Sequence, residues 1–310
     1  NEIIYVDAVN GNDTTGDGTE STPVKTIQKA QTLISVDNTA ILLAEGEYNE
    51  VVVNNPASKG GGREYALFIS RPYSYSVLSL NPTSTFINVT FDRNYCYLIS
   101  QTNVKEINLY NLNINIDIQY NFAAGANTAI ISDGAISSAG KFRSYNCVYN
   151  FVGVSSYYRE LVYINSPVDW EFNNCTFLFN SSYSCTGHKN NNTAAVFKNC
   201  VFDSVARWTG WYKNSTSYSP YLVLINCIES NSASSYINVT RNNPIVKDVS
   251  FDENYNITNT DVWVDAGTGL DPDGSQADIG VYGGPFAWGI PLVVEAYLNI
   301  NETYNQLVNV

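Results

Sequence analysis

Two acidic loops contain the residue types that bind hard cations. The first, NGNDTTGDGTE, places Asp13 and Asp17 among glycines, and the second, DPDGSQAD, places Asp271, Asp273 and Asp278 around a glycine. Glycines permit the tight turning that would bring carboxylate oxygens together around calcium, although neither loop has the spacing of an EF-hand. The alternative is that these carboxylates accept hydrogen bonds from backbone amides in Asx-turns. If calcium binds, we expect it to fasten the ends of the fold rather than to take part in catalysis.

The central part of the chain shows no pattern typical of a polysaccharide-cleaving enzyme. A lyase acting on uronates needs a Lys or Arg base near carboxylates that hold calcium, and a glycoside hydrolase needs two or three neighbouring carboxylates. The carboxylates in this part of the chain are scattered: Asp117, Asp133, Asp169 and Asp203. None of the candidate bases falls near two carboxylates one or two coils apart: Lys141, Arg143, Arg159, Lys198, Arg207 and Lys213. The single histidine, His188, lies in the polar stretch SSYSCTGHKNNN, where a solvated ring is expected rather than a Ser-His-Asp site. We therefore assign no catalytic residue.

A repeated element must position all of these side chains, and an Asn-Cys pair marks it. The pair recurs with steps of 28, 25 and 27 residues, at Asn146-Cys147, Asn174-Cys175, Asn199-Cys200 and Asn226-Cys227. Self-similarity at such a period is typical of a solenoid, and the flanking runs, such as VDWEFNNCTF and PYLVLINCI, favour strands. The pattern predicts an all-β fold, a single-domain parallel β-helix whose four Asn residues stack about 4.8 Å apart. We expect an Asn ladder, in which each side-chain amide bonds to the next.

The same repeat predicts how the cysteines are arranged. The four repeat cysteines should form a column of small, buried thiols, because parallel Cβ vectors about 4.8 Å apart are wider than a disulfide prefers. Cys96 and Cys185 lie off this column and could pair with each other. The chain has no CxxC spacing, which makes a zinc site less favoured still.

Both ends of the chain resemble a known family. Residues 5–50 contain a first strand, an Asp/Gly loop, the run TPVKTIQKA and the run ILLAEGEYNE, and residues 271–285 read DPDGSQADIGVYGGP. These segments resemble the opening and closing cassettes of secreted right-handed parallel β-helix proteins of the pectate-lyase-like superfamily. The resemblance covers nearly the whole chain and implies the fold, whereas the superfamily includes lyases, hydrolases, adhesins and surface-layer components.

The resemblance and the residue pattern together suggest three regions. Residues 1–38 form an N-terminal cap with a strand and a short amphipathic helix, on which Val24, Ile27 and Ala30 share a face and which Ser21 or Thr22 caps. Residues 39–285 form the coils, to about Tyr282, and the closing segment. Residues 286–310 form a C-terminal extension.

The extension carries a strand pattern of its own. From residue 292 onward it contains no Gly or Pro, and the apolar residues Val294, Ala296, Leu298 and Ile300 alternate with polar and aromatic ones. Such a half-buried strand must find a sheet edge, on its own solenoid or on a neighbouring copy. We expect it to join copies of the protein head-to-tail.

The composition of the chain indicates where the protein acts and which classes of partner are excluded. The 310 residues include 16 Lys and Arg against 29 Asp and Glu, which argues against nucleic acid and anionic lipid as partners, and no apolar run is long enough for membrane insertion. An acidic chain rich in Asn, Ser and Tyr is typical of the cell exterior. There Asn180, Asn191 and Asn214, in sequons within expected polar insertions, are candidate glycosylation sites.

One aromatic stretch, RWTGWYKNSTSYSPY, is too polar to be wholly buried and predicts a loop with exposed rings. Trp208, Trp211 and Tyr212 in this loop could stack on sugars or form a subunit contact. Taken with the absence of a catalytic pattern, the sequence favours an extracellular structural protein that assembles into a layer, sheath or filament. The alternative is a polysaccharide lyase or hydrolase, or a glycan-binding spike, of β-helix type.

Overall fold

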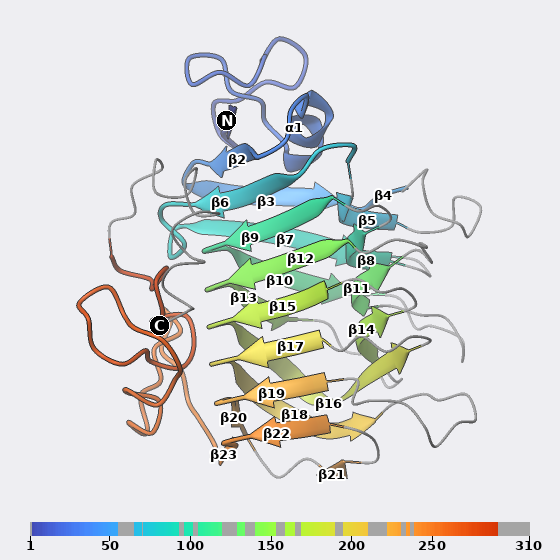
Figure 1. Ribbon diagram of the computed structural model, residues 1–310. Coiled ribbons are helices and arrows are strands. Elements are labelled where there is room, and N and C mark those ends of the chain that lie inside the picture. Colours follow the sequence, from blue (N-terminus) through green and yellow to red (C-terminus); the bar gives the residue numbers. More distant parts are fainter. Residues whose placement is uncertain are drawn as a thin grey trace.

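The computed structural model describes residues 2–54, 65–69, 71–92, 96–101, 105–119, 129–133, 140–152, 159–164, 169–189, 195–209, 222–230, 234–235 and 239–290. Parallel strands are wound into a solenoid, with one short helix over its N-terminal end (Figure 1). The predicted single-domain parallel β-helix is therefore confirmed.

Two hydrogen-bonded sheets run along the solenoid: a 9-stranded sheet, which we call sheet A, and a 14-stranded sheet. The 14-stranded sheet has two parts, which we call sheets B and C, and the long strands β16 and β18 belong to both. Sheet A contains, in spatial order, β1 (Ile3–Val6), β2 (Thr39–Leu43), β6 (Tyr75–Ser79), β9 (Glu106–Tyr110), β12 (Lys141–Tyr145), β15 (Asp169–Asn173), β17 (Ala195–Lys198), β19 (Leu222–Ile225) and β22 (Val239–Asn242). Sheet B contains β3 (Gly46–Val51), β7 (Thr85–Phe91), β10 (Asn113–Ile118), β13 (Val148–Phe151), β16 (Thr176–Lys189), β18 (Val201–Thr209), β20 (Ile228–Glu229) and β23 (Ile245–Val246). Sheet C contains β5 (Tyr65–Ile69), β8 (Cys96–Gln101), β11 (Ala129–Asp133), β14 (Arg159–Ile164), the second halves of β16 and β18, and β21 (Ser234–Ser235). The two-residue strand β4 (Val53–Asn54) pairs antiparallel with β5.

From β9 onward, each turn from sheet A to sheet B is made at an Asn in the left-handed conformation. The φ angles are 50° at Asn146, 52° at Asn174, 52° at Asn199 and 48° at Asn226. Asn tolerates this conformation better than other residues with a Cβ atom, which explains its recurrence at the turn. The strand residue that follows each turn pairs with its counterpart on the next coil, so the four Asn residues occupy equivalent positions as the sequence predicts.

The core is a set of stacked aromatic rings beside the thiol column. Phe172 stacks on Phe197 with ring centroids 4.7 Å apart, and Phe177 stacks on Phe202 at 4.9 Å. One coil step of about 4.8 Å sets this spacing. The four repeat cysteines are buried and free, as expected, and Cys96 is buried as well.

Pairing of Cys96 with Cys185 does not fit the fold. Cys96 begins β8 and Cys185 lies in β16, and the order β8-β11-β14-β16 puts three strand steps between them. Three steps amount to about 14 Å, twice the roughly 7 Å that a disulfide can bridge between Cα atoms.

The N-terminal end of the solenoid is covered. The helix α1 (Ile27–Leu33) begins later than the sequence suggests, because Thr26 and not Ser21 or Thr22 is its N-cap and accepts a hydrogen bond from the Lys29 amide at 3.1 Å. Val24, expected on the helix, instead forms a bridge with Val6 of β1. The buried helix residues Ile27 and Ala30 then cover the apolar end of the core.

The C-terminal end differs from the expectation. The described strands end at Val246, not near Tyr282, and residues 247–290 return along the side of the solenoid (Figure 1). We call residues 266–288 the strap. Phe286, Ala287 and Trp288 are only 6%, 2% and 3% exposed, so the first part of the predicted extension packs on its own subunit.

Candidate functional site

The N-terminal acidic loop directs its carboxylates at its own backbone. Asp13 accepts hydrogen bonds from the amides of Lys25 at 2.7 Å and Thr26 at 3.0 Å, and from the Thr26 hydroxyl at 2.7 Å. Asp17 accepts from the Thr19 amide at 3.1 Å and from the Thr22 hydroxyl. These hydrogen bonds lower the pKa of Asp17, that from Thr22 most. Asp13 thus joins the loop to the N-cap of α1, whereas Asp17 bonds within the loop itself.

The C-terminal acidic loop is arranged in the same way. Asp271 accepts from the amides of Asp278 at 3.2 Å and of Gly284, and Asp278 accepts from the Asp265 amide at 2.8 Å. Asp273 accepts from the amide and the hydroxyl of Ser275 at 2.9 and 2.6 Å. Burial raises the pKa of Asp271 and of Asp278, although hydrogen bonds from backbone amides lower it. The loop fits the Asx-turn interpretation better than a calcium site.

A melting experiment separates these two interpretations of the acidic loops. No three His, Cys, Asp or Glu residues converge as metal ligands in the described part of the chain. We therefore expect the melting temperature to be the same in millimolar-scale calcium and in chelator, because a ligand stabilises only the state that binds it. A rise in melting temperature that saturates with calcium, and that Asp13→Asn or Asp271→Asn abolishes, would show instead that calcium fastens an end of the fold.

The outer side of sheet A gathers charged residues that the sequence interpretation treated as scattered. The Arg143 guanidinium on β12 lies 2.7 Å from the Asp169 carboxylate and 3.2 Å from the Glu171 carboxylate, both on β15. Lys198 on β17 lies 2.7 Å from Glu171. The expectation that no base falls near two carboxylates is wrong for Arg143, because the register pairs it with Glu171 on the next coil.

The protonation state of Arg143 limits what this cluster can do. Burial would lower the pKa of Arg143, but the hydrogen bond to Asp169 and the charges of Asp169 and Glu171 outweigh burial and raise it. A guanidinium held in its charged form cannot abstract a proton, as the base of a lyase must. The cluster is a chain of ion pairs across three coils, and Asp169, whose side chain is 56% exposed, is its most accessible member.

The remaining enzyme candidates are dispersed over the sheets. Asp117 lies on β10 and Asp203 on β18 in sheet B, whereas Asp133 on β11 and Arg159 on β14 belong to sheet C. His188 lies on β16 and pairs in register with Tyr163 of β14. Arg207 lies on β18, and Lys213 is outside the described residues.

The Asn turn column binds the strap more than it binds itself. Asn146 donates to the carbonyls of Val281 and Gly283 at 2.9 and 2.7 Å, and Asn174 donates to the carbonyl of Asp278 at 2.8 Å. Among the four predicted ladder residues, the described bonds include one amide-to-amide contact, from Asn199 to Asn174 at 3.4 Å. The predicted ladder is therefore replaced in large part by a backbone segment that runs along the column.

A second row of Asn residues lies on the outer side of sheet B. We call Asn49, Asn88, Asn115 and Asn150 the amide row; they occupy one register position on β3, β7, β10 and β13. Each side-chain amide donates to the carbonyl of the preceding rung, at 3.2 Å from Asn88, 2.9 Å from Asn115 and 2.9 Å from Asn150. Asn49 is exposed and the other three are half-buried, so a continuous polar track faces solvent.

Aromatic side chains border this track. Tyr255 donates its hydroxyl to Asn113 at 3.2 Å, and Asn113 lies on the same side of β10 as Asn115. Tyr255 and Tyr282 both lie edge-on to Trp288, with ring centroids 6.0 and 6.1 Å apart. Both tyrosines are half-buried, so part of each ring remains accessible beside the track.

Two local features set Tyr255 and Asn113 apart from ordinary packing. Tyr255 has a φ of 65°, a left-handed conformation that is strained for a bulky residue. The amides of Asn254 and Asn256 each donate to Asp252 at 2.9 Å and hold this turn. The side chain of Asn113 is buried, and its Nδ2 has no acceptor among the described residues. Strain and orphaned polar groups are concentrated at binding sites.

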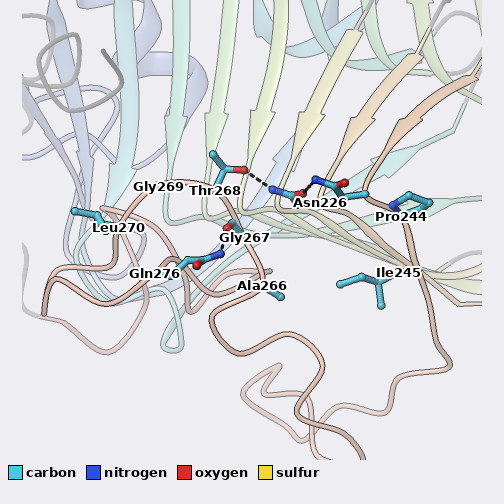
Figure 2. Close-up of a pocket in the computed structure, with 10 residues that line it drawn as sticks. Asn226, Pro244, Ile245, Ala266, Gly267, Thr268, Gly269, Leu270 and Gln276 are labelled. Atoms are coloured by element: carbon cyan, nitrogen blue, oxygen red, sulfur yellow. Dashed lines mark hydrogen bonds between the residues drawn. The ribbon is translucent and has the colours of Figure 1, made fainter. Parts of the chain in front are cut away.

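A pocket lies elsewhere, near the C-terminal end. It measures about 680 Å³ and lies between the last Asn turn and the strap (Figure 2). Its lining has no charged or aromatic side chain: Asn226, Asn243, Pro244, Ile245, Ala266, Gly267, Thr268, Gly269, Leu270 and Gln276. Without a titratable group this pocket has no means of acid-base catalysis.

Other predicted site residues lie in strands or outside the described residues. Asn180 belongs to the 14-residue strand β16, not to an insertion that stands off the coils. Trp208 is also in a strand, β18, and pairs in register with Cys185. The others are outside the described residues: Asn191, Asn214, Trp211, Tyr212, Val294, Ala296, Leu298 and Ile300.

Comparisons with known proteins find a partial family match and two solved structures of similar fold. Residues 9–55 match the model of a family described as "Protein of unknown function (DUF1565)", and no curated protein matches the chain. A rhamnogalacturonan lyase structure is similar at a TM-score of 0.51 and 13% identity, over 80% of this chain and 63% of that one. The chain thus spans less than two thirds of that protein. A pectin methylesterase from Aspergillus niger is similar at a TM-score of 0.42 and 11% identity, over 98% of this chain and 95% of that one.

The architecture is accordingly a parallel β-helix, a fold similar to that of the solved rhamnogalacturonan lyase. No helix among the described residues is long and apolar enough to cross a membrane.

Proposed function

We propose that the protein binds an extended, neutral polysaccharide outside the cell, along the amide row of sheet B. The observation that carries this proposal is the ladder of three amide-to-amide hydrogen bonds on an outward-facing, solvent-accessible row. A side-chain amide has two donors and a carbonyl with two lone pairs, so each interior rung retains one donor and one acceptor for a ligand. Sugar hydroxyls are both donors and acceptors, so they can bond to the free donor and the free acceptor of each interior rung.

Spacing and charge narrow the ligand class. The rungs repeat once per coil, about every 4.8 Å, which is close to the length of one sugar ring in an extended chain. The net charge of −13 repels a polyanion such as pectate, whereas a neutral chain meets no such barrier. Tyr255 and Tyr282, beside the row, offer ring surface on which a sugar can stack. A carbohydrate ligand also agrees with the similarity in fold to a protein named rhamnogalacturonan lyase.

Binding fits the geometry better than cleavage does. The carboxylates of Asp169 and Glu171 lie on sheet A, away from the amide row, and both are paired with the same guanidinium. The amide row itself contains no group that could exchange a proton near neutral pH.

Substituting the central rung tests this proposal. Asn115→Ala removes the ligand bonds of one rung and breaks two ladder bonds, so we expect about a tenfold weaker affinity, given about 1 to 1.5 kcal/mol per hydrogen bond. The measurement is affinity electrophoresis in gels containing xyloglucan, galactomannan or mixed-linkage glucan, with pectate and alginate as acidic comparisons.

Asn242→Ala is the matched control, because Asn242 is an exposed amide on sheet A. It should leave mobility shifts unchanged. Absence of a shift with every neutral polymer, or a shift that Asn115→Ala does not reduce, would refute binding along the row.

Self-assembly into an extracellular layer, sheath or filament is a second candidate function. The observation that favours it is the difference between the two ends of the solenoid. At the N-terminal end Val6, Val24 and Ile27 are at most 1% exposed, whereas at the other end Val246 of β23 is 57% exposed. An uncovered strand edge is a surface on which another chain can pair.

A further inference from the structure

We infer that β22, at the C-terminal end of sheet A, pairs with residues 294–300 from the tail of a neighbouring copy. This inference deepens the second candidate function, self-assembly, and names the two surfaces that would meet. β22 ends the nine-strand order of sheet A, and no described residue pairs with its outer edge (Figure 1).

The free edge of β22 has the geometry that an added strand needs. Val239 and Arg241 pair in register with Leu222 and Leu224, so their side chains continue the inward columns of the core. Arg241 is held by Glu229, with N–O distances of 2.7 and 2.9 Å, and its side chain is 23% exposed. An incoming strand would therefore cover an apolar column and a partly exposed ion pair.

The tail has the matching pattern. Val294, Ala296, Leu298 and Ile300 alternate with more polar residues, so one side of an extended strand is apolar and small enough to pack beneath the last coil. Pairing of this kind gives backbone hydrogen bonds and apolar pockets for every second side chain. Ile245, which follows the last Asn turn and lines the pocket of Figure 2, offers an apolar wall at the same end.

Chain length indicates that the tail comes from another copy. Trp288 donates to the Asn146 carbonyl at 2.7 Å, which fixes the strap at the level of the turn after β12. An added strand below β22 would lie five strand steps from β12, about 24 Å along the axis. The Trp288 amide also donates to the Val281 carbonyl, which accepts from the Asn146 side chain, so the backbone of Trp288 lies near that turn. The six residues from Trp288 to Val294 span at most about 20 Å, so a strand that begins at Val294 fits the edge of a neighbouring copy better than its own.

The donor copy must then lie beside the acceptor and be offset along the axis. Its tail leaves the strap part-way along the solenoid, whereas the acceptor edge is at the end. This contact is heterologous, because one surface is given and a different one is received, and it propagates into a ring or filament instead of closing as a two-fold dimer.

Truncation after Ile290 tests the inference while keeping Trp288 in place. We expect the full chain to form assemblies in light scattering with size-exclusion chromatography and in electron microscopy, and residues 1–290 to be a folded monomer with an unchanged melting temperature. Leu298→Asp should also dissociate the assemblies, since it puts a charge on the apolar side of the strand. Its matched control, Asn299→Asp, faces the other way and should leave them intact.

The outcomes separate the inference from the function on which it rests. A monomeric full chain at all concentrations would overturn both self-assembly and tail exchange. Assembly that persists in residues 1–290, or in Leu298→Asp, would overturn tail exchange and leave self-assembly standing. A markedly lower melting temperature of residues 1–290 at monomer concentrations would show that the tail packs on its own subunit.

Discussion

Trp288→Ala should lower the free energy of unfolding by about 3 to 5 kcal/mol, the range for removing a large aromatic side chain from a buried site. Trp288 is 3% exposed, and its ring packs between Tyr255 and Tyr282. Its indole also donates to the Asn146 carbonyl, a bond across 142 residues of sequence. The substitution leaves a cavity and an unpaired carbonyl where the strap meets the turn column.

The loss should be concentrated in the strap, because a solenoid can open one part while its coils remain folded. We expect urea unfolding to show an earlier transition, and hydrogen exchange to show faster exchange at the amides of Gly280 and Gly283. Trp288→Phe keeps most of the ring volume but not the donor, and should cost about 1 kcal/mol. Equal stability of Trp288→Ala and the native chain would show that the strap does not stabilise the solenoid.

The strap lies so close to the Asn turn column that some of its positions have room only for glycine. A Cβ atom at Gly284 would lie 2.6 Å from the side-chain oxygen Oδ1 of Asn174, and one at Gly267 would lie 2.9 Å from the Asn199 side chain. The closing cassette that resembles other β-helix proteins is thus a segment built to lie on the turn column. That role was not evident from the sequence, since the column and the strap are over 100 residues apart for some partners.

The fold was predictable because, from β9 onward, a tight Asn turn occurs at the same place in every coil. Each Asn turn ends a strand of sheet A and precedes a strand of sheet B by two residues, so the repeat interval shows directly in the sequence. The other two corners of each coil have loops of variable length. No comparable phase marker exists there, which is why the extent of β16 and β18 was not predicted.

The amide row could have been found by counting from the same turns. Asn115 and Asn150 each lie four residues after a turn Asn, at Asn111 and Asn146. Counting back three residues from Asn146 and Asn174 likewise gives Arg143 and Glu171, the ion pair on sheet A. The positions of Asn115 and Asn150 in the amide row, and of the Arg143–Glu171 ion pair, could therefore have been predicted from the sequence. Asn88 and Asn49 were not accessible in this way, because no turn Asn precedes their strands.

A pH titration of stability should show the effect of one buried carboxyl, Glu50 on β3. Glu50 is 4% exposed, and its Oε1 accepts a hydrogen bond from the Ile27 amide at the start of α1 at 2.7 Å. Its Oε2 is buried without a hydrogen-bond partner among the described residues. Burial raises the pKa of Glu50 to about 7 from an ordinary 4.5, although the amides of Ile27 and Gln28 lower it and Asp13 raises it further.

The sign of the effect follows from proton counts. Between pH 4.5 and 7 the folded state binds a proton at Glu50 that the unfolded state has lost, so stability is greatest below pH 4.5 and falls as the pH rises to about 7. A shift of this size corresponds to about 3 kcal/mol in all. Above pH 7 the ionised carboxylate remains buried at the cap, and the loss is complete.

Glu50→Gln should remove this pH dependence and leave the chain about 3 kcal/mol more stable than the native one at pH 8, because the amide oxygen can still accept from Ile27. The measurement is urea unfolding at steps between pH 4 and 8, read as the difference between variant and native chain, so that other titrating groups such as Asp271 and Asp278 cancel. Glu47→Gln is the control, since Glu47 lies on the same strand with its side chain exposed. Its curve should run parallel to the native curve. If the Glu50→Gln curve does so too, then Glu50 ionises in the folded state as it does in the unfolded one, and the cap is not sensitive to pH.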